Sequence, residues 1–184
     1  MNKKERIYLT GFMTSGKSTI GPITANVLGW EFYDLDSVIE ERENRTIVKI
    51  FEENGEQYFR ELESRTLKEY SSLKNVVISL GGGTINNKEN FDLIKETGIL
   101  IYLKVSPEAL YNRLKNKINR PLFRDLVLEQ RPKKDFIDRI RKILDEREVY
   151  YNEADLIVNT EITRIGITVD RLVNKIKKMI DEKD

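Results

Sequence analysis

A segment near the start of the chain combines the residue types and the spacing that bind phosphate groups. Residues 11–19 read Gly-Phe-Met-Thr-Ser-Gly-Lys-Ser-Thr, which contains the pattern Gly-x-x-x-x-Gly-Lys-Ser between an apolar stretch and a helical pattern. Glycines let the backbone curl so that successive N–H groups converge on phosphate oxygens, and the following helix N-terminus adds partial positive charge. We therefore expect a loop that binds the phosphates of a nucleoside triphosphate.

The side chains of this loop have distinct expected roles. Lys17 can reach the β- and γ-phosphates, the Ser18 hydroxyl can ligate Mg²⁺, and Thr19 places one further donor near the α-phosphate. The alternative is a glycine-rich turn that binds nothing, but such a turn does not require both glycines, the lysine and the serine in register. The loop residues predicted to bind ATP are Thr14, Ser15, Gly16, Lys17, Ser18 and Thr19.

Two carboxylates follow the next predicted strand. Asp34 and Asp36 stand directly after it, at the strand end where ligands bind in open α/β sheets. In extended chain both would point toward the phosphates, so one could hold a metal-bound water while the other accepts a hydrogen bond from a substrate hydroxyl. The alternative is that Asp36 only caps the next helix, a position for which Ser37 competes through its capping-box pattern with Glu40.

The composition narrows the chemistry further. The chain contains no Cys and no His, so zinc sites of the His/Cys type, thiol nucleophiles and triads with a His base are excluded. Acid–base work must fall to Asp, Glu, Lys or Tyr, and a bound metal must be a hard cation on oxygen ligands. Because the strand predicted at residues 76–80 ends in glycines rather than in an acid, Asp34 and Asp36 remain to support this metal.

Charge and hydropathy bear on partners and location. The chain has 32 Lys and Arg against 31 Asp and Glu, a formal net charge of +1, whereas a nucleic-acid binder would carry a marked basic excess. The apolar runs are too short to span a bilayer, and residues 1–6 lead into a strand pattern without an apolar signal region. We expect a cytoplasmic protein that binds neither nucleic acid nor membrane.

Short apolar segments alternate with helical patterns along the chain. Residues 17–28 read as a helix whose apolar side includes Ile20, Ile23 and Val27. Such alternation, with strands apolar on both faces, implies a parallel sheet between two layers of helices. We predict a three-layer α/β/α fold in a single domain over residues 1–184. Strands are predicted at residues 7–9, 31–33, 76–80, 98–105 and 156–158, and further helices from Ser37 and at residues 46–54, 56–72, 88–97, 107–117, 133–149 and 165–180.

With these motifs the chain resembles the shikimate kinase family. The resemblance runs from about residue 7 to residue 158, and four segments besides the loop and the aspartates carry it in family order. Many families share the phosphate loop, whereas the combination of all these segments is specific. The four segments are Gly55-Glu56-Gln57-Tyr58-Phe59-Arg60-Glu61-Leu62-Glu63, Ser79-Leu80-Gly81-Gly82-Gly83, Asn119-Arg120-Pro121-Leu122, and Arg147 ahead of Tyr151.

The resemblance implies a P-loop kinase fold with a five-stranded parallel sheet and a mobile lid at about residues 114–134. It implies a monomer that uses ATP and Mg²⁺ to phosphorylate the 3-hydroxyl of shikimate, on the route to chorismate and the aromatic amino acids. Shikimate carries a carboxylate and three ring hydroxyls, and guanidinium groups bind carboxylates through bidentate charge-assisted bonds. Arg60 and Arg147 match the two carboxylate-binding arginines of the family.

The resemblance also implies roles for individual residues. Asp36 matches the aspartate that binds the substrate hydroxyls and is the candidate base, and Asp34 matches the one that supports Mg²⁺ through water. Arg120 matches the lid arginine that closes over the phosphates, which makes Lys17, Asp36 and Arg120 the implied catalytic set. Arg113 corresponds to an arginine that packs against adenine. The substrate is implied to approach the backbone at Gly81, Gly82 and Gly83.

Some of these residues have ordinary alternative interpretations. Arg60 could form an i,i+4 pair with Glu56 on a helix surface, Arg120 could be a surface arginine before a proline, and the three glycines could form nothing more than a tight turn.

The chain also departs from the family pattern in two places. Arg147 lies seven residues before Ala154, where the family usually has eight. The distance from Arg120 to Arg147 is several residues longer than in short family members, which predicts an extension around residues 124–134.

Two rival functions remain. A gluconate kinase would share the loop and the lid, but its substrate has no need of two arginines beside an Asp-x-Asp pair. A catalytically inactive binding domain of the same family would typically lose the lysine, the serine or the substrate arginines. This chain has all of them: Lys17, Ser18, Asp34, Asp36, Arg60 and Arg120.

Overall fold

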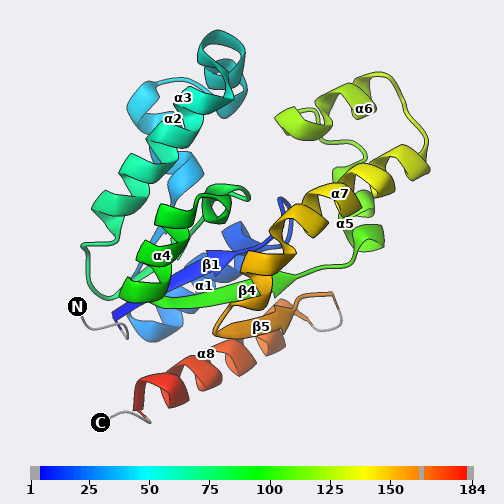
Figure 1. Cartoon of the computed structure of the whole chain (residues 1–184). Coiled ribbons are helices and arrows are strands. Elements are labelled where there is room, and N and C mark those ends of the chain that lie inside the picture. The colour runs from blue at the N-terminus through cyan, green and yellow to red at the C-terminus, as the bar shows by residue number, and fades with distance from the viewer. Residues whose placement is uncertain (1–4, 162–163, 182–184) are drawn as a thin grey trace.

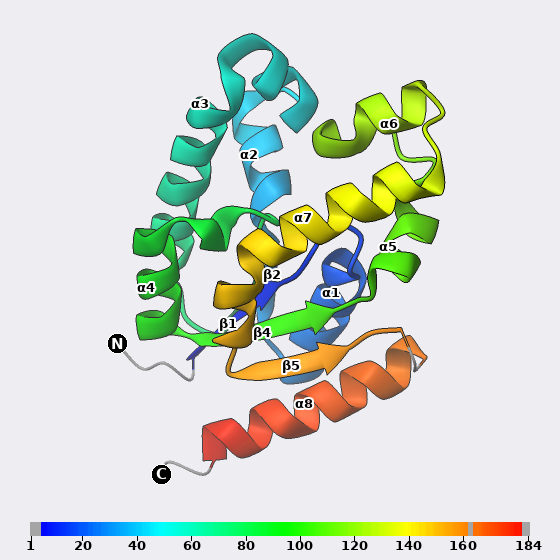
Figure 2. The same cartoon turned by 45° about the vertical axis from the view of Figure 1, so that its right-hand side comes forward.

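The computed structural model describes residues 5–161 and 164–181 as a five-stranded parallel sheet with helices on both faces (Figures 1 and 2). The strand order is β2-β3-β1-β4-β5, so β3 and β2 lie on one side of the central strand β1, and β4 and β5 lie on the other. The strands are β1 (Arg6–Thr10), β2 (Glu31–Asp34), β3 (Val76–Ser79), β4 (Ile99–Lys104) and β5 (Leu156–Asn159). The helices are α1 (Lys17–Leu28), α2 (Leu35–Glu43), α3 (Ile47–Tyr70), α4 (Lys88–Thr97), α5 (Pro107–Leu114), α6 (Arg124–Leu128), α7 (Lys133–Asn152) and α8 (Ile165–Asp181), with 3₁₀ turns η2 (Thr84–Asn86) and η3 (Pro121–Phe123).

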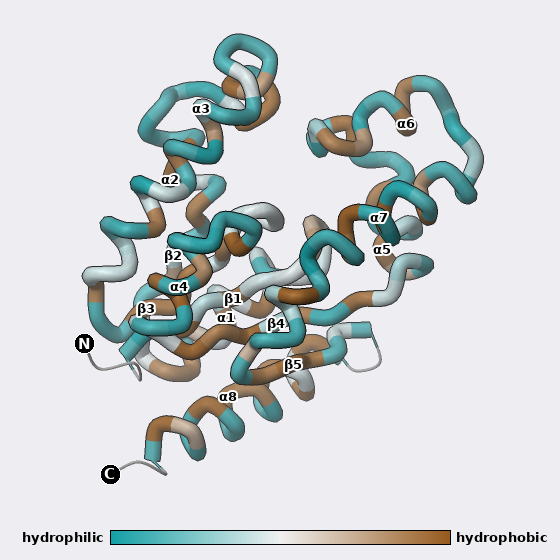
Figure 3. The backbone as a smooth tube through the Cα atoms, in the orientation of Figure 1, coloured by the Kyte–Doolittle hydropathy of each residue, from teal (hydrophilic) through white to brown (hydrophobic). Residues whose placement is uncertain are grey.

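Alternate residues of the central strands build two separate cores. Ile7 and Leu9 of β1 point to the face covered by α1 and α8, while Tyr8 between them points to the face covered by α3, α4 and α7. Figure 3 shows the apolar colour along β1, β4 and the sheet side of α8. The prediction that every strand is apolar on both faces was wrong for β2, which contains Glu31 and Asp34. Both β2 and β5 are partly exposed, because they form the edges of the sheet.

Helix α1 buries a different side from the predicted one. Ile20 is buried, but Ile23 and Val27 are 40% and 47% exposed, and small residues face the sheet instead. Gly21 lies so close to the ring of Phe32 that a Cβ at this position would collide with it. A close approach of α1 to the sheet needs small side chains. The pattern of apolar residues alone therefore predicted the wrong buried face of this helix.

Two projections rise beyond the carboxyl ends of the strands. One consists of α2 and the first half of α3, packed around Ile39, Ile50 and Phe59. The other is the connection between α5 and α7 (residues 115–132), which lies within the range predicted as a lid and is called the lid segment below. Its base packs around Phe123 and Phe136. Figures 1 and 2 show α3 and α6 facing each other above the sheet.

Helix boundaries agree with the sequence expectation at some points and not at others. The predicted break at Gly55 is present as a bend within α3, where Gly55 has φ 82° and ψ 171°. Helix α5 ends at Leu114 rather than at residue 117, and α7 continues to Asn152. No helix among the described residues has the length and apolarity needed to cross a membrane.

Candidate active site

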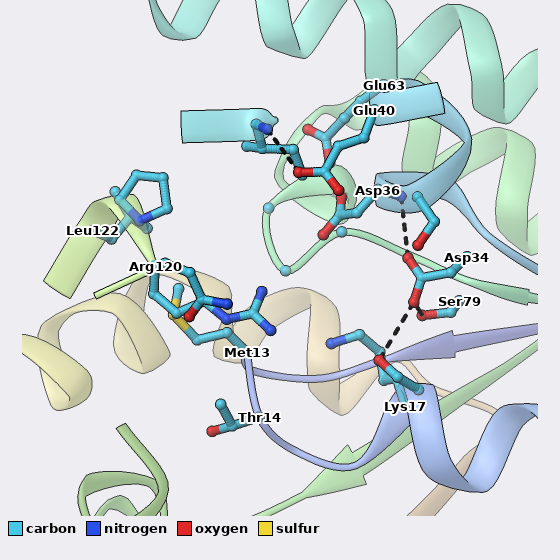
Figure 4. Close-up of a pocket in the computed structure, with 18 of the residues that line it drawn as sticks. Met13, Thr14, Lys17, Asp34, Asp36, Glu40, Glu63, Ser79, Arg120 and Leu122 are labelled. Atoms are coloured by element: carbon cyan, nitrogen blue, oxygen red, sulfur yellow. Dashed lines mark hydrogen bonds between the residues drawn. The ribbon is translucent and has the colours of Figure 1, made fainter. Parts of the chain in front are cut away.

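A cavity of about 690 Å³ opens between the two projections, above the ends of β1, β2 and β3. Its floor is the phosphate loop, which joins β1 to α1, and its walls come from α2, α3, the three glycines after β3, and the lid segment. Figure 4 shows Lys17, Asp34 and Asp36 on one side of this cavity and Arg120 and Leu122 on the other. The cavity therefore brings together the predicted residues that lie far apart in the sequence.

The phosphate loop has the backbone form that anion binding needs. Gly16 adopts φ 110° immediately before α1, and the loop is closed by a 3.1 Å hydrogen bond from Ser15 N to the carbonyl of Phe12. Lys17 Nζ donates to the carbonyls of Gly11 and Phe12, at 2.8 and 3.2 Å, so its ammonium lies over the loop. Burial lowers the pKa of Lys17 to about 8, with nearby aspartates opposing this shift.

The outer side of the loop contacts α5. Arg113 Nη1 donates a 2.8 Å hydrogen bond to the carbonyl of Thr14, which has a positive φ of 64°. Thr160 in the segment after β5 donates through its hydroxyl to the carbonyl of Ser15, at 3.0 Å. Arg113 thus lies beside the phosphate loop and shares this side with the residues that follow β5. Its contact with adenine stays a prediction.

Asp34 and Asp36 differ from the sequence expectation in their local structure. Helix α2 begins at Leu35, two residues earlier than predicted, and its N-cap is Asp34, whose Oδ1 accepts from Asp36 N at 3.1 Å. The predicted capping role of Ser37 was wrong, as was the extended geometry of the pair. Asp34 comes from the strand end and Asp36 from the first helical turn, and both still line the cavity.

Asp34 is placed to support a metal ion beside the phosphate loop. Its Oδ2 accepts from the hydroxyls of Ser79, at 3.1 Å, and Ser18, at 3.5 Å. A hydroxyl and a carboxylate oxygen at this separation suit Mg²⁺, which keeps several waters and binds substrate phosphates rather than a full protein cage. Among the described residues, no group of three or more Asp, Glu, His or Cys side chains could hold a metal ion.

Asp36 has the properties of a proton acceptor. Burial, together with the charges of Glu63 and Asp34, raises its pKa from an ordinary 3.8 to about 7, while Lys17 and Arg120 oppose the shift. Its buried Oδ1 has no hydrogen-bond partner. A buried carboxylate oxygen without a donor is costly, and a substrate hydroxyl would satisfy it.

Arg60 takes part in the ordinary helix pair and also lines the cavity. Its Nε and Nη2 donate to Glu56 Oε1 at 3.2 and 2.8 Å, which is the i,i+4 contact given above as the alternative. Its Nη1 contacts Glu63, which is buried and accepts a 2.6 Å hydrogen bond from the Thr84 hydroxyl. Glu63 was not predicted as a site residue. The available signal was an acid three residues after Arg60 on the same helix face.

Arg147 is a buried cation with unsatisfied donors. It is only 4% exposed, its Nε and Nη1 have no hydrogen-bond partner, and its guanidinium lies 5.8 Å from the ring centroid of Phe12. The missing residue before Ala154 does not displace it, because Arg147 is inside α7 and Ala154 follows the end of that helix. A carboxylate is the ligand that such a guanidinium would bind.

Arg120 reaches the site from the lid segment, where it directly precedes η3. It lines the cavity, its Nε is buried without a partner, and its positive charge lowers the pKa values of Lys17 and Asp36. It is therefore not the surface arginine of the alternative interpretation. Its charge acts on both the predicted phosphate lysine and the predicted base.

Comparison with known proteins decides the family. The family model described as shikimate kinase matches residues 13–180. A shikimate kinase from Chlorobaculum parvum is 48% identical over 180 residues, which cover 98% of this chain and 96% of that protein. The chain belongs to the shikimate kinase family.

Solved shikimate kinases also share the fold. The enzyme from Bacteroides thetaiotaomicron is 36% identical with a TM-score of 0.84, and the match covers 94% of this chain and 98% of that one. The enzyme from Acinetobacter baumannii, solved in complex with shikimate, is 34% identical with a TM-score of 0.81, covering 96% and 92%. The three-layer fold with a parallel sheet, predicted from the strand and helix pattern, is confirmed, and the chain is an ATP-dependent kinase of the shikimate kinase family.

Proposed function

We propose that this shikimate kinase family member transfers the γ-phosphoryl group of ATP to the 3-hydroxyl of shikimate, and that the cavity described above is its active site. The observation that carries the proposal is the convergence on one cavity of the phosphate-loop Lys17, the high-pKa carboxylate of Asp36, and the guanidinium of Arg147, whose Nε and Nη1 have no partner. A donor site, a proton acceptor and a carboxylate receptor are the three parts that this reaction needs.

The acceptor is held by its carboxylate. Arg147 approaches the cavity from α7, against Gly82, and Arg60 approaches it from α3, against Gly83. Two guanidinium groups that converge on one carboxylate fix both its position and its orientation. Glu63 holds Arg60 through their ion pair and is itself held by Thr84. A neutral polyol such as gluconamide, or a nucleoside, would leave the buried charge of Arg147 without a partner.

The transferred group is positioned by the phosphate loop and neutralised by cations. Lys17 and Arg120 supply positive charge to the phosphoryl oxygens, and backbone N–H groups of the loop bind the β-phosphate. Ser18, and Asp34 through water, would hold Mg²⁺, which would supply further positive charge to the phosphates. Asp36 orients the 3-hydroxyl and accepts its proton late in the transfer, for which its raised pKa suits it.

The lid segment, proposed to be mobile, closes over the phosphates and excludes water, which limits ATP hydrolysis. We also propose that Arg113 packs against adenine, because it lies beside the loop at Thr14. We further propose that the protein is a monomer with one catalytic domain. Use of ATP as the phosphoryl donor supports a cytoplasmic location.

A comparison of acceptors tests this function. Rates of ATP-dependent phosphorylation should be measured with shikimate, with its neutral methyl ester, with gluconate and with AMP. We expect kcat/KM for shikimate to exceed that for the ester by about 100-fold, because the ester cannot form two charge-assisted pairs. Gluconate or AMP phosphorylated as fast as shikimate would contradict the assignment.

A further inference from the structure

A single ion pair joins the two projections that flank the cavity. Arg124 Nη1, at the first residue of α6 in the lid segment, lies 2.6 Å from Glu52 Oε1 on the first half of α3. The two side chains are 43% and 59% exposed. Among the residues that the structure describes, this is the one hydrogen bond or ion pair between the lid segment and the projection formed by α2 and α3.

The other polar contacts of the lid segment join it to its own base. Arg139 of α7 donates to the carbonyl of Leu122, at 3.0 Å, and pairs with Asp125 at 2.6 Å. Phe123 is fully buried against the rings of Phe12 and Phe136. These contacts fix where the lid segment starts and folds. They do not hold it against the opposite wall, which leaves that task to Arg124 and Glu52.

Both members of the pair are close to residues that line the cavity. Arg124 follows Arg120 across the single turn of η3, in which Phe123 N donates to the carbonyl of Arg120 at 3.0 Å. Glu52 follows Phe51, which lines the acceptor side, and precedes the bend of α3 at Gly55. A displacement of Arg124 would therefore move Arg120, and a displacement of Glu52 would move the acceptor wall.

We propose that Arg124 and Glu52 are positioning residues that hold Arg120 over the phosphate loop by tying the lid segment to the acceptor wall. This inference rests on the proposed function of the site, and it places the tie in the stretch where the sequence predicts an extended lid. An exposed ion pair of this kind favours the tied arrangement by about two- to five-fold. The effect is screened by salt, because both charges are reached by solvent.

Neutral and charge-reversed variants test the tie. The test set is Glu52→Gln, Arg124→Gln, Glu52→Arg, Arg124→Glu and the double charge swap. Matched controls are Glu53→Gln, which breaks the pair with Arg45 on the same projection, and Arg131→Gln, which breaks the pair with Asp135 at the base of the lid segment. Each control loses one partly exposed charge pair that does not cross the cavity.

We expect Glu52→Gln and Arg124→Gln to raise the KM for shikimate by up to about two-fold at low ionic strength, with a smaller change in kcat. The rise is limited because the tied arrangement predominates in the wild type and only the tied fraction binds both substrates productively. The single charge reversals should raise the KM for shikimate further, and the double charge swap should bring it most of the way back to the wild-type value. All these differences in KM should shrink in 0.5 M salt. Neutral variants that match their controls, or a swap no better than the single reversals, would overturn the proposal.

A second measurement separates this inference from the proposed function. Amide hydrogen exchange of residues 119–128 in the substrate-free protein reports lid opening without any reaction. We expect Glu52→Gln to speed exchange in this segment by about two- to five-fold relative to Glu53→Gln. Equal exchange in the two variants would refute the tie. If exchange differs between the two variants but the wild-type protein does not phosphorylate shikimate, only the proposed function is refuted.

Discussion

Gly82 lies against the guanidinium of Arg147, so that a Cβ on this glycine would be 3.0 Å from Nη1. The neighbouring glycines have the same relationship to other charged groups of the site. A Cβ on Gly83 would be 2.8 Å from Nη1 of Arg60, and one on Gly81 would collide with Oε1 of Glu63 and be 2.9 Å from Oδ1 of Asp36. The three glycines are thus more than a tight turn, because each leaves room for charged side chains of the site.

Gly82→Ala should displace Arg147 without changing the backbone, since Gly82 does not have a positive φ. We expect the KM for shikimate to rise about ten-fold while the KM for ATP stays within two-fold, because a small shift of a bidentate clamp is costly. Gly166→Ala is the matched control, since a Cβ there meets nothing within 4 Å. Equal changes in both KM values would argue against a clamp at Arg147.

Arg147→Met should separate stability from function. The arginine is buried with two unpaired donors, so an apolar side chain of similar length should leave the free energy of unfolding unchanged or raise it. The KM for shikimate should rise about 100-fold, because the buried carboxylate loses its charged partner. Urea denaturation and steady-state kinetics on the same preparation provide the check. A destabilised variant with an unchanged KM would make Arg147 a structural residue.

Asp36→Asn should make stability depend on pH differently from wild type. A carboxyl with a raised folded-state pKa stabilises the protein below its unfolded pKa, and this stability is lost as pH rises through the folded value of about 7. The variant has no such group. In magnesium-free buffer, its free energy of unfolding should therefore rise relative to that of the wild type between pH 4 and pH 7, to a difference of roughly 2–4 kcal/mol, and the difference should then stay constant. Parallel stability curves from pH 4 to 8 would contradict the raised pKa.

Asp34→Asn should weaken the use of magnesium with little effect on folding. Asparagine keeps an oxygen for the N-cap of α2 but removes the negative charge beside Ser18. We expect the Mg²⁺ concentration for half-maximal rate to rise about ten-fold, with activity recovered at high Mg²⁺. Titration of the rate with MgCl₂ at fixed ATP measures this. A variant with the wild-type Mg²⁺ dependence would move the metal-supporting role away from Asp34.

The phosphate loop could be predicted from the sequence because its chemistry is local. Phosphate binding by residues 11–19 depends on glycines, a lysine and a serine in one continuous stretch, and the structure forms that loop. The family resemblance also pointed to Arg147 despite the shortened turn after it. Its burial depends on Phe12 and Gly82, which lie far away in the sequence.

The incorrect and missed predictions arise where packing and long-range contacts override a local sequence pattern. Ser37 and Glu40 form a capping-box pattern, yet Asp34 caps the helix, because the strand ends at Asp34 and its side chain can accept from Asp36 N. Glu40 instead accepts from Ile47 N at 2.8 Å and joins α2 to α3. Glu63 was missed because its role depends on contacts with Arg60 and Thr84, which no single stretch of sequence contains.

The most direct test of the central claim is the release of ADP from MgATP with and without shikimate, followed in a coupled assay. We predict that shikimate raises the rate at least about 100-fold over the ATPase background, with one shikimate phosphorylated per ADP released. Lys17→Ala should lower the shikimate-dependent rate by about three orders of magnitude or more. A protein that binds ATP tightly but releases ADP at the same rate with and without shikimate would contradict the account.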